Sequence, residues 1–139
     1  YYMNIAIRAL IYIMVGMTGE IIYTAVKALI LKRDLRLQGY TQLWVMPIYA
    51  MGGVFIFEPL HLAMVAAGWN ILIRFIIYAF IIFAMEFIFG FLDKRIIGKC
   101  PWQYKCKWSI GGYIDLHKFP FWGAAGLAFE LIHNYLLSL

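Results

Sequence analysis

Residues 69–92 read WNILIRFIIYAFIIFAMEFIFGFL, and this stretch decides the fold class. Arg74 and Glu86 are its only charged residues, and nearly every other position is apolar. A helix needs about 20 residues to cross a hydrocarbon core about 30 Å thick, and this stretch is long enough to do so. Because it is apolar on nearly every face, we predict a transmembrane helix.

Three other stretches have the same character: Ile5 to Leu31, Gln42 to Ala67 and Phe119 to Leu139. The whole chain is 65% hydrophobic and 14% charged, far from the roughly 45–50% apolar and 25% charged residues of a soluble domain. Segments of about ten residues with alternating polarity, which form membrane β-barrels, are absent from the sequence. We therefore predict an all-α membrane protein, with four transmembrane helices in a single domain over residues 1–139.

Positively charged residues concentrate in two of the connections between these helices. Since Lys and Arg are retained on the cytoplasmic side of a membrane, we predict that both basic loops are cytoplasmic and that both chain ends lie outside. The net charge of +5 then reflects topology and attraction to the anionic lipid bilayer, and it needs no nucleic-acid partner. The basic residues are Lys32, Arg33 and Arg36 in the first loop and Lys94, Arg95, Lys99, Lys105, Lys107 and Lys118 in the second.

Both cysteines, Cys100 and Cys106, fall in the second basic loop. A stable disulfide is rare on the reducing side of the membrane, and a Cys-x5-Cys pair alone is a weak metal signal. We therefore expect free thiols, and we assign no role to the nearby His117.

The two halves of the chain resemble each other. Each half is a helical hairpin, over residues 4–67 and residues 69–139, so the repeats are predicted to run parallel and to be related by a pseudo-twofold axis along the membrane normal. Arg8, Tyr12 and Glu20 recur as Arg74, Tyr78 and Glu86 at an offset of 66, Glu58 and His61 as Glu130 and His133 at 72, and Pro47 as Pro120 at 73.

All four glutamates lie inside the predicted helices. An ionisable side chain in a bilayer costs several kcal/mol unless it pairs, takes up a proton or lines a cavity, so such a residue indicates a functional site. Counting along the helices predicts that these side chains form one buried column. The candidate site residues are Glu20, Glu58, His61, Glu86, Glu130 and His133, with Arg8, Tyr12, Arg74 and Tyr78 in support.

The residue types in this column match those of ferritin-like dinuclear bundles, in which two helices each supply a Glu and two each supply Glu-x-x-His. Such a set could hold two divalent ions, iron or manganese, with positions left open. The similarity concerns the site and not the fold, because those bundles need a long crossover between their second and third helices. Here a short turn at Ala67-Gly68-Trp69 takes its place.

Other interpretations of the column remain open. Without a metal it could bind a small cationic or protonatable substrate or couple transport to protons, and with one it could serve a membrane oxidase. Alternatively, the polar groups could form only a structural network, with Glu58 and Glu130 paired to Arg74 and Arg8 across the pseudo-twofold axis, in a noncatalytic subunit. Four helices bury few faces, so we expect a homodimer or membership of a membrane complex. Enzymatic activity is left undecided.

Five stretches, spread over nearly the whole chain, carry a resemblance to a known family: Gly19-Glu20, Trp44 to Gly52, Glu86 to Gly90, Cys100-Pro101-Trp102-Gln103-Tyr104 and Gly126 to Glu130. The family that they resemble contains bacterial proteins labelled "putative ABC-transporter type IV" and the vertebrate transmembrane protein 229 group, and the resemblance implies transport. Gln103 stands where the family usually has Asp. The chain contains no nucleotide-binding motif of the form G-x-x-x-x-G-K-[ST].

Overall fold

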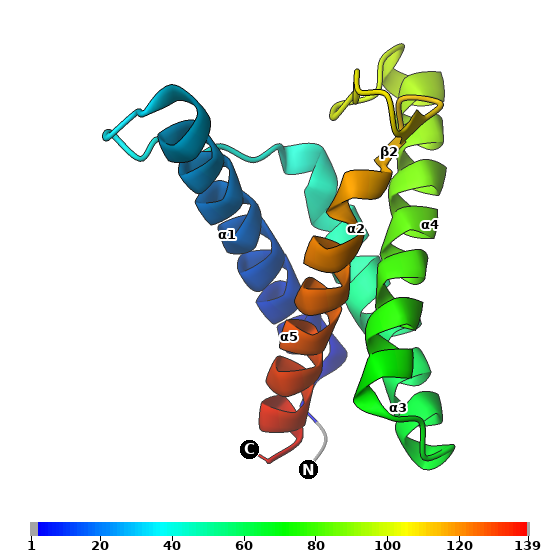
Figure 1. Ribbon diagram of the computed structural model, residues 1–139. Helices are drawn as coiled ribbons and strands as arrows, with labels where there is room; N and C mark the ends of the chain where they lie inside the picture. Colours follow the sequence, from blue (N-terminus) through cyan, green and yellow to red (C-terminus); the bar gives the residue numbers. More distant parts are fainter. Residues whose placement is uncertain (1–2, 139) are drawn as a thin grey trace. The chain divides into compact units, whose positions relative to one another are not determined.

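The computed structural model describes residues 3–138, and most of them are helical (Figure 1). Three helices are long and apolar enough to cross a membrane: Ile5–Lys32 (α1), Leu43–Ala66 and Ile71–Ile97 (α4). Large apolar side chains such as Met14, Leu72 and Phe80 are exposed along them, as expected for helices whose solvent is lipid. The protein is therefore an integral membrane protein.

The fourth predicted span is present as a helix, α5, over Phe119–Ser138. It is not among the three helices that are apolar enough to cross a membrane on composition alone. Glu130, His133 and Asn134 lie in this helix and lower its hydropathy.

Within the described residues, the chain forms two compact units, residues 3–57 and residues 58–138. The boundary falls inside the second apolar helix, and not at the short turn between the two predicted hairpins.

In residues 3–57, α1 begins at Asn4, whose side chain accepts a hydrogen bond from the backbone N–H of Ala6. The second apolar helix starts with a 3₁₀ turn, Leu43–Val45 (η1), followed by α2, Met46–Met51, and a π-helical segment, Gly52–Phe57 (η2). Pro47 lies in the first turn of α2, where its missing N–H costs nothing. The α1 helix packs against both α2 and η2.

The π-helical segment η2 coincides with a change in the sequence offset between the two hairpins. Gly53 precedes Glu58 by five positions, whereas Gly126 precedes Glu130 by four. A π turn accommodates one extra residue in an otherwise α-helical stretch. The wide turn therefore absorbs the residue by which the offset changes from 73 to 72.

In residues 58–138, the second apolar helix continues as α3, Glu58–Ala66, and a turn leads to α4. Asn70 caps α4 through a hydrogen bond from the N–H of Ile73; it lies 66 positions after the Asn4 cap. The α4 and α5 helices lie side by side (Figure 1). Gly123 and Gly126 on α5 make close packing possible.

The loop between α4 and α5 folds over the end of α4. Strands β1, Ser109–Ile110, and β2, Ile114–Asp115, pair antiparallel, joined by Gly111 and Gly112 with positive φ. A 3₁₀ turn, Leu116–Lys118 (η3), then leads into α5. Trp102 donates its indole N–H to the carbonyl oxygen of Tyr113, which ties the Cys-Pro-Trp-Gln-Tyr segment to this hairpin.

Two details of α4 differ from the sequence prediction. The helix continues to Ile97, five residues beyond the predicted end at Leu92. Asp93, which the predicted boundary left outside the helix, is therefore a buried residue of α4. A charged residue ends the apolar run, but the hydrogen-bonded backbone continues past it.

Candidate functional site

A partly buried ion pair joins α4 to α5. Arg74 donates from Nε to Oε2 of Glu130 at 3.0 Å and from Nη2 to Oε1 at 2.8 Å. This two-pronged contact is the geometry that a planar guanidinium favours with a carboxylate. The Tyr78 hydroxyl is a third donor, 2.8 Å from Oε2. Glu130 is therefore held as a charged group by three donors.

His61 extends this network from α3. Its Nδ1 lies 3.0 Å from the Tyr78 oxygen and 3.4 Å from Oε2 of Glu130. Its Nε2 lies 3.1 Å from Oδ1 of Asn134, an exposed residue of α5. Because Tyr78 donates its proton to Glu130, the ring can donate from Nδ1 to the phenol oxygen and from Nε2 to Asn134. A doubly protonated His61 fits these partners without rearrangement.

A second pair of an acid and an imidazole lies beside the first. Nδ1 of His133 is 3.5 Å from Oε1 of Glu58, and both side chains are almost fully buried. The rings of His61 and His133 meet edge to face with centroids 5.3 Å apart. Two imidazolium charges at that distance repel by roughly 3 kcal/mol at an effective dielectric constant of 20. The rings therefore lie close enough for a positive charge on one to oppose a positive charge on the other.

The structure thus brings together four of the six predicted site residues, with two of their predicted supporting residues. Glu58, His61, Glu130 and His133 are each less than a tenth exposed. Arg74 does not reach across to Glu58 in the way the structural-network interpretation suggested, but binds Glu130 of its own hairpin.

Glu86 does not join this cluster, although the sequence analysis placed it in the same column. It lies eight residues beyond Tyr78 on α4, which corresponds to about 12 Å along the helix. Its carboxylate accepts hydrogen bonds from the Tyr104 hydroxyl at 2.9 Å and from the Trp122 indole at 3.1 Å. Lys118 in turn donates to the Tyr104 oxygen. Glu86 therefore ties the loop and the first turn of α5 to α4.

The remaining predicted residues lie in residues 3–57. Glu20 accepts hydrogen bonds from the hydroxyl groups of Thr41, at 2.5 Å, and Tyr49, at 2.8 Å. Arg8 is buried. Tyr12 is also buried, and its ring packs edge to face on Phe57. In this unit Glu20 fastens the loop after α1 to α2.

The surroundings of Glu20 and Glu86 match at the sequence offsets found above. Tyr49, which binds Glu20, and Trp122, which binds Glu86, are 73 positions apart, as are Pro47 and Pro120. In both hairpins, an aromatic side chain about one turn into the second helix donates a hydrogen bond to the glutamate carboxylate of the first helix.

A close contact between an aromatic ring and a glycine also occurs in both hairpins. A Cβ atom at Gly53 would overlap the ring of Tyr12, and a Cβ atom at Gly126 would overlap Tyr78. The tyrosines are 66 positions apart and the glycines 73. The two tyrosines are thus separated by the offset found for the first helix of each hairpin, and the two glycines by the offset found for the start of the second helix.

Sequence analysis did not identify the polar partners of the predicted residues, Asn134 and Tyr104 among them. Asn134 follows His133 directly and lies one turn after Glu130, a helical spacing that would have placed it on the same face. Tyr104 belongs to the Cys-Pro-Trp-Gln-Tyr segment, and nothing in the sequence indicated its contact with Glu86.

The two cysteines occupy different environments. Cys100 is buried and Cys106 is exposed. Burial raises the pKa of the Cys100 thiol, and the nearby carboxylates of Asp93 and Glu86 act in the same direction. Cys100 is therefore a protonated packing residue near neutral pH.

No solved structure matches this chain. The family described as "Putative ABC-transporter type IV" matches residues 9–139, which include every residue of the buried Glu/His cluster and the Cys-Pro-Trp-Gln-Tyr loop. That match confirms the family resemblance drawn from the sequence, and the chain belongs to this family.

Proposed function

We propose that the protein takes part in membrane transport and that its buried Glu/His cluster binds a proton in exchange for a small cationic substrate. The family description, which names transport, supports the first half of this proposal. The observation that carries the second half is the continuous hydrogen-bonded path from Arg74 through Glu130, Tyr78 and His61 to the exposed Asn134.

Each part of the path has a chemical role in this proposal. Arg74 keeps Glu130 charged, so this carboxylate acts as a fixed countercharge. The two imidazoles share one proton, and Asn134 is the polar group through which that proton or a cation enters. Glu58, 3.5 Å from His133, is the carboxylate that changes partners during exchange.

The proton-binding step can be measured without knowing the substrate. We expect potentiometric titration of the purified protein to show that wild type takes up about one more proton between about pH 8 and pH 5 than the His61→Gln/His133→Gln variant. His117→Gln, which removes an exposed histidine outside the cluster, is the matched control for the loss of an imidazole. Equal proton uptake by wild type and the double variant would contradict the proposal.

Transport itself can be tested in proteoliposomes that contain a pH-sensitive dye. Small organic and inorganic cations added outside should drive proton movement through wild type. Glu58→Gln should abolish it, whereas Glu86→Gln should preserve it because Glu86 lies outside the cluster and glutamine keeps its shape. Proton movement that survives Glu58→Gln would remove this residue from the exchange step.

Divalent metal binding is the second candidate function, with iron or manganese as the expected ions. Its support is the proximity of the Glu58 carboxylate to the His133 imidazole and the match of residue types to dinuclear sites. Arg74 occupies both oxygens of Glu130, so a dinuclear site would require this ion pair to open. Metal analysis of the purified protein tests this candidate function. About two equivalents of metal in wild type that are lost in Glu58→Ala/Glu130→Ala would establish the site.

We further propose that the two hairpins are duplicates and that α5 is a fourth crossing, which leaves both chain ends outside and both basic loops cytoplasmic. The matched Asn caps, the matched aromatic donors to glutamate and the matched tyrosine–glycine contacts support the duplication. The positive charges of the loops support the orientation. Assembly as a homodimer or within a larger complex remains a prediction from the large exposed apolar surface.

A further inference from the structure

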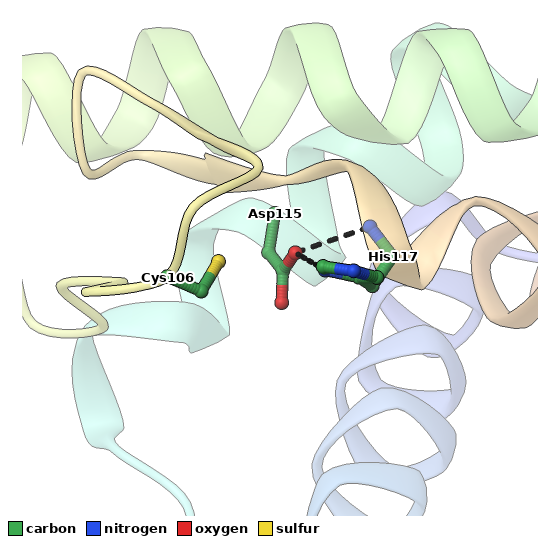
Figure 2. A group of neighbouring side chains, drawn as sticks. All are labelled: Cys106, Asp115 and His117. Carbon is green, nitrogen blue, oxygen red and sulfur yellow. Dashed lines mark hydrogen bonds and ion pairs between the residues drawn. The ribbon is translucent and has the colours of Figure 1, made fainter.

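The loop between α4 and α5 brings together three residues of metal-binding chemistry that have no part in the proposed transport site. Cys106, Asp115 and His117 each offer one ligand atom, and these atoms all lie within 4.8 Å of one another. Among the described residues 3–138, the loop thus holds a thiol, a carboxylate and an imidazole in one small group. Figure 2 shows the three side chains gathered on one side of the hairpin.

The hairpin fixes the positions of these ligands. Ser109 donates its backbone N–H to the carbonyl oxygen of Cys106, and Ser109 pairs with Asp115 across the two strands. Asp115 caps the following 3₁₀ turn by accepting the backbone N–H of His117 at 3.1 Å. The turn that carries the thiol is therefore connected to Asp115 through the strand pairing, and the Asp115 side chain is connected in turn to the backbone of His117.

The side chains are also oriented toward one another. Nδ1 of His117 lies 3.0 Å from Oδ1 of Asp115, and the ring of Trp108 packs edge to face on the imidazole at 6.0 Å. The backbone N–H and the ring Nδ1 of His117 both lie within hydrogen-bonding distance of Oδ1 of Asp115.

We propose that Cys106, Asp115 and His117 bind one zinc ion, or a similar divalent transition metal, at the surface of this loop. Zinc takes thiolate, imidazole and carboxylate ligands at bond lengths that place ligand atoms roughly 3.3 to 3.6 Å apart in a tetrahedron. A closure of about 1 Å from the present arrangement gives that geometry. Three protein ligands leave the fourth position for water.

Charge and compartment are compatible with such a site. A thiolate and a carboxylate together neutralise a divalent ion, so the bound trio adds no net charge to the basic loop that contains Lys105 and Lys107. In the proposed orientation the loop is cytoplasmic, where thiols remain reduced and free to bind metal.

The arrangement fits a metal better than a nucleophilic cysteine. In a catalytic cysteine site, the imidazole activates the thiol and a third group orients the imidazole. Here Nδ1 of the imidazole lies 3.0 Å from Oδ1 of Asp115, and the Asp115 side chain is drawn between those of Cys106 and His117 (Figure 2). The carboxylate therefore stands between the two groups.

Cobalt is the probe that tests this proposal, because a cobalt–thiolate bond gives a charge-transfer absorption that carboxylates and imidazoles do not. We expect the purified, reduced, full-length protein to bind one Co²⁺ with this absorption, and Zn²⁺ to displace it. Cys106→Ser should abolish the absorption, whereas Cys100→Ser should keep it. The Glu/His cluster contains no thiol and cannot give this absorption, so the result is independent of the transport proposal.

The other two ligands supply the decisive comparison. Asp115→Asn and His117→Gln should each weaken Co²⁺ binding by about tenfold or more, and Asp34→Asn, in the other basic loop, should leave it unchanged. The proposal is overturned if no thiolate absorption develops at saturating Co²⁺ or if the absorption depends on Cys100. It is equally overturned if both ligand variants bind as tightly as wild type, since a lone thiol would then explain the signal.

Discussion

Tyr78 packs so closely on Gly126 that even a methyl group at position 126 would overlap the Cβ atom of Tyr78. Since that atom is attached to the α4 backbone, the overlap could be relieved only by moving α4 and α5 apart. We expect Gly126→Ala to destabilise the protein by about 1–3 kcal/mol, the usual cost of overpacking. Unfolding in mixed detergent micelles measures this change.

The matched control is Gly19→Ala, because Gly19 also lies in a helix but has open space where the methyl group would stand. Alanine there should be neutral or stabilising by up to about 1 kcal/mol, through its higher helix propensity. Equal effects of the two substitutions would show that the tight contact with Tyr78 does not limit stability.

A second prediction concerns the ion pair between Arg74 and Glu130. Arg74→Met leaves a buried carboxylate without its main partner and should cost about 3 kcal/mol, as removal of one member of a buried pair usually does. Adding Glu130→Gln should recover much of that loss. The four proteins form a double-mutant cycle, and a coupling energy near zero would exclude a strong ion pair.

A third prediction uses the π-helical segment Gly52–Phe57. Deletion of Phe55, an exposed residue in it, should convert the wide turn to an ordinary α-helical turn and keep Glu58 on its present face. Deletion of Phe80, which is equally exposed but lies within regular α4, rotates the remainder of that helix by about 100°. The first variant should fold, as judged by size-exclusion chromatography, and the second should aggregate. Aggregation of both would contradict this interpretation of the segment.

A fourth prediction concerns the side of the membrane on which the cysteines lie. A membrane-impermeant maleimide should label Cys106 in inside-out vesicles but not in intact cells, because we place its loop in the cytoplasm. Cys100 should react more slowly on either side: it is buried, and its raised pKa leaves less thiolate at a given pH. Single-cysteine variants separate the two signals. Labelling of Cys106 from outside the cell would reverse the proposed topology.

The sequence predicted the helices well and the loops poorly, for physical reasons. Spanning a membrane requires a long apolar run, so the end of α1 was predicted within one residue, at Leu31 against Lys32. The end of α4 was missed, since apolarity stops at Asp93 but helical hydrogen bonding does not. The bounds of the two strands could not be predicted, because strands of two residues contain too few positions to show alternation.

The candidate site was likewise predicted only in part. Glu58 and Glu130 could be selected because ionisable residues are rare in apolar helices. Their hydrogen-bond partners depend on helix rotation and on which helices pack together, and neither can be counted along a sequence. Thus the contact between Arg74 and Glu130 within one hairpin, and the separate location of Glu86, emerged only from the structure.

The wide turn of η2 has a consequence at the level of the gene. If the two hairpins arose by duplication, they now differ by a single codon in the second helix. The segment from the glycine that contacts the tyrosine to the glutamate is one residue longer in the first hairpin than in the second. Insertion or loss of that codon would shift one glutamate relative to its neighbours while leaving the other untouched. Relatives that lack it would carry two hairpins of equal register, and comparison of their proton uptake with that of this protein would show what the asymmetry does.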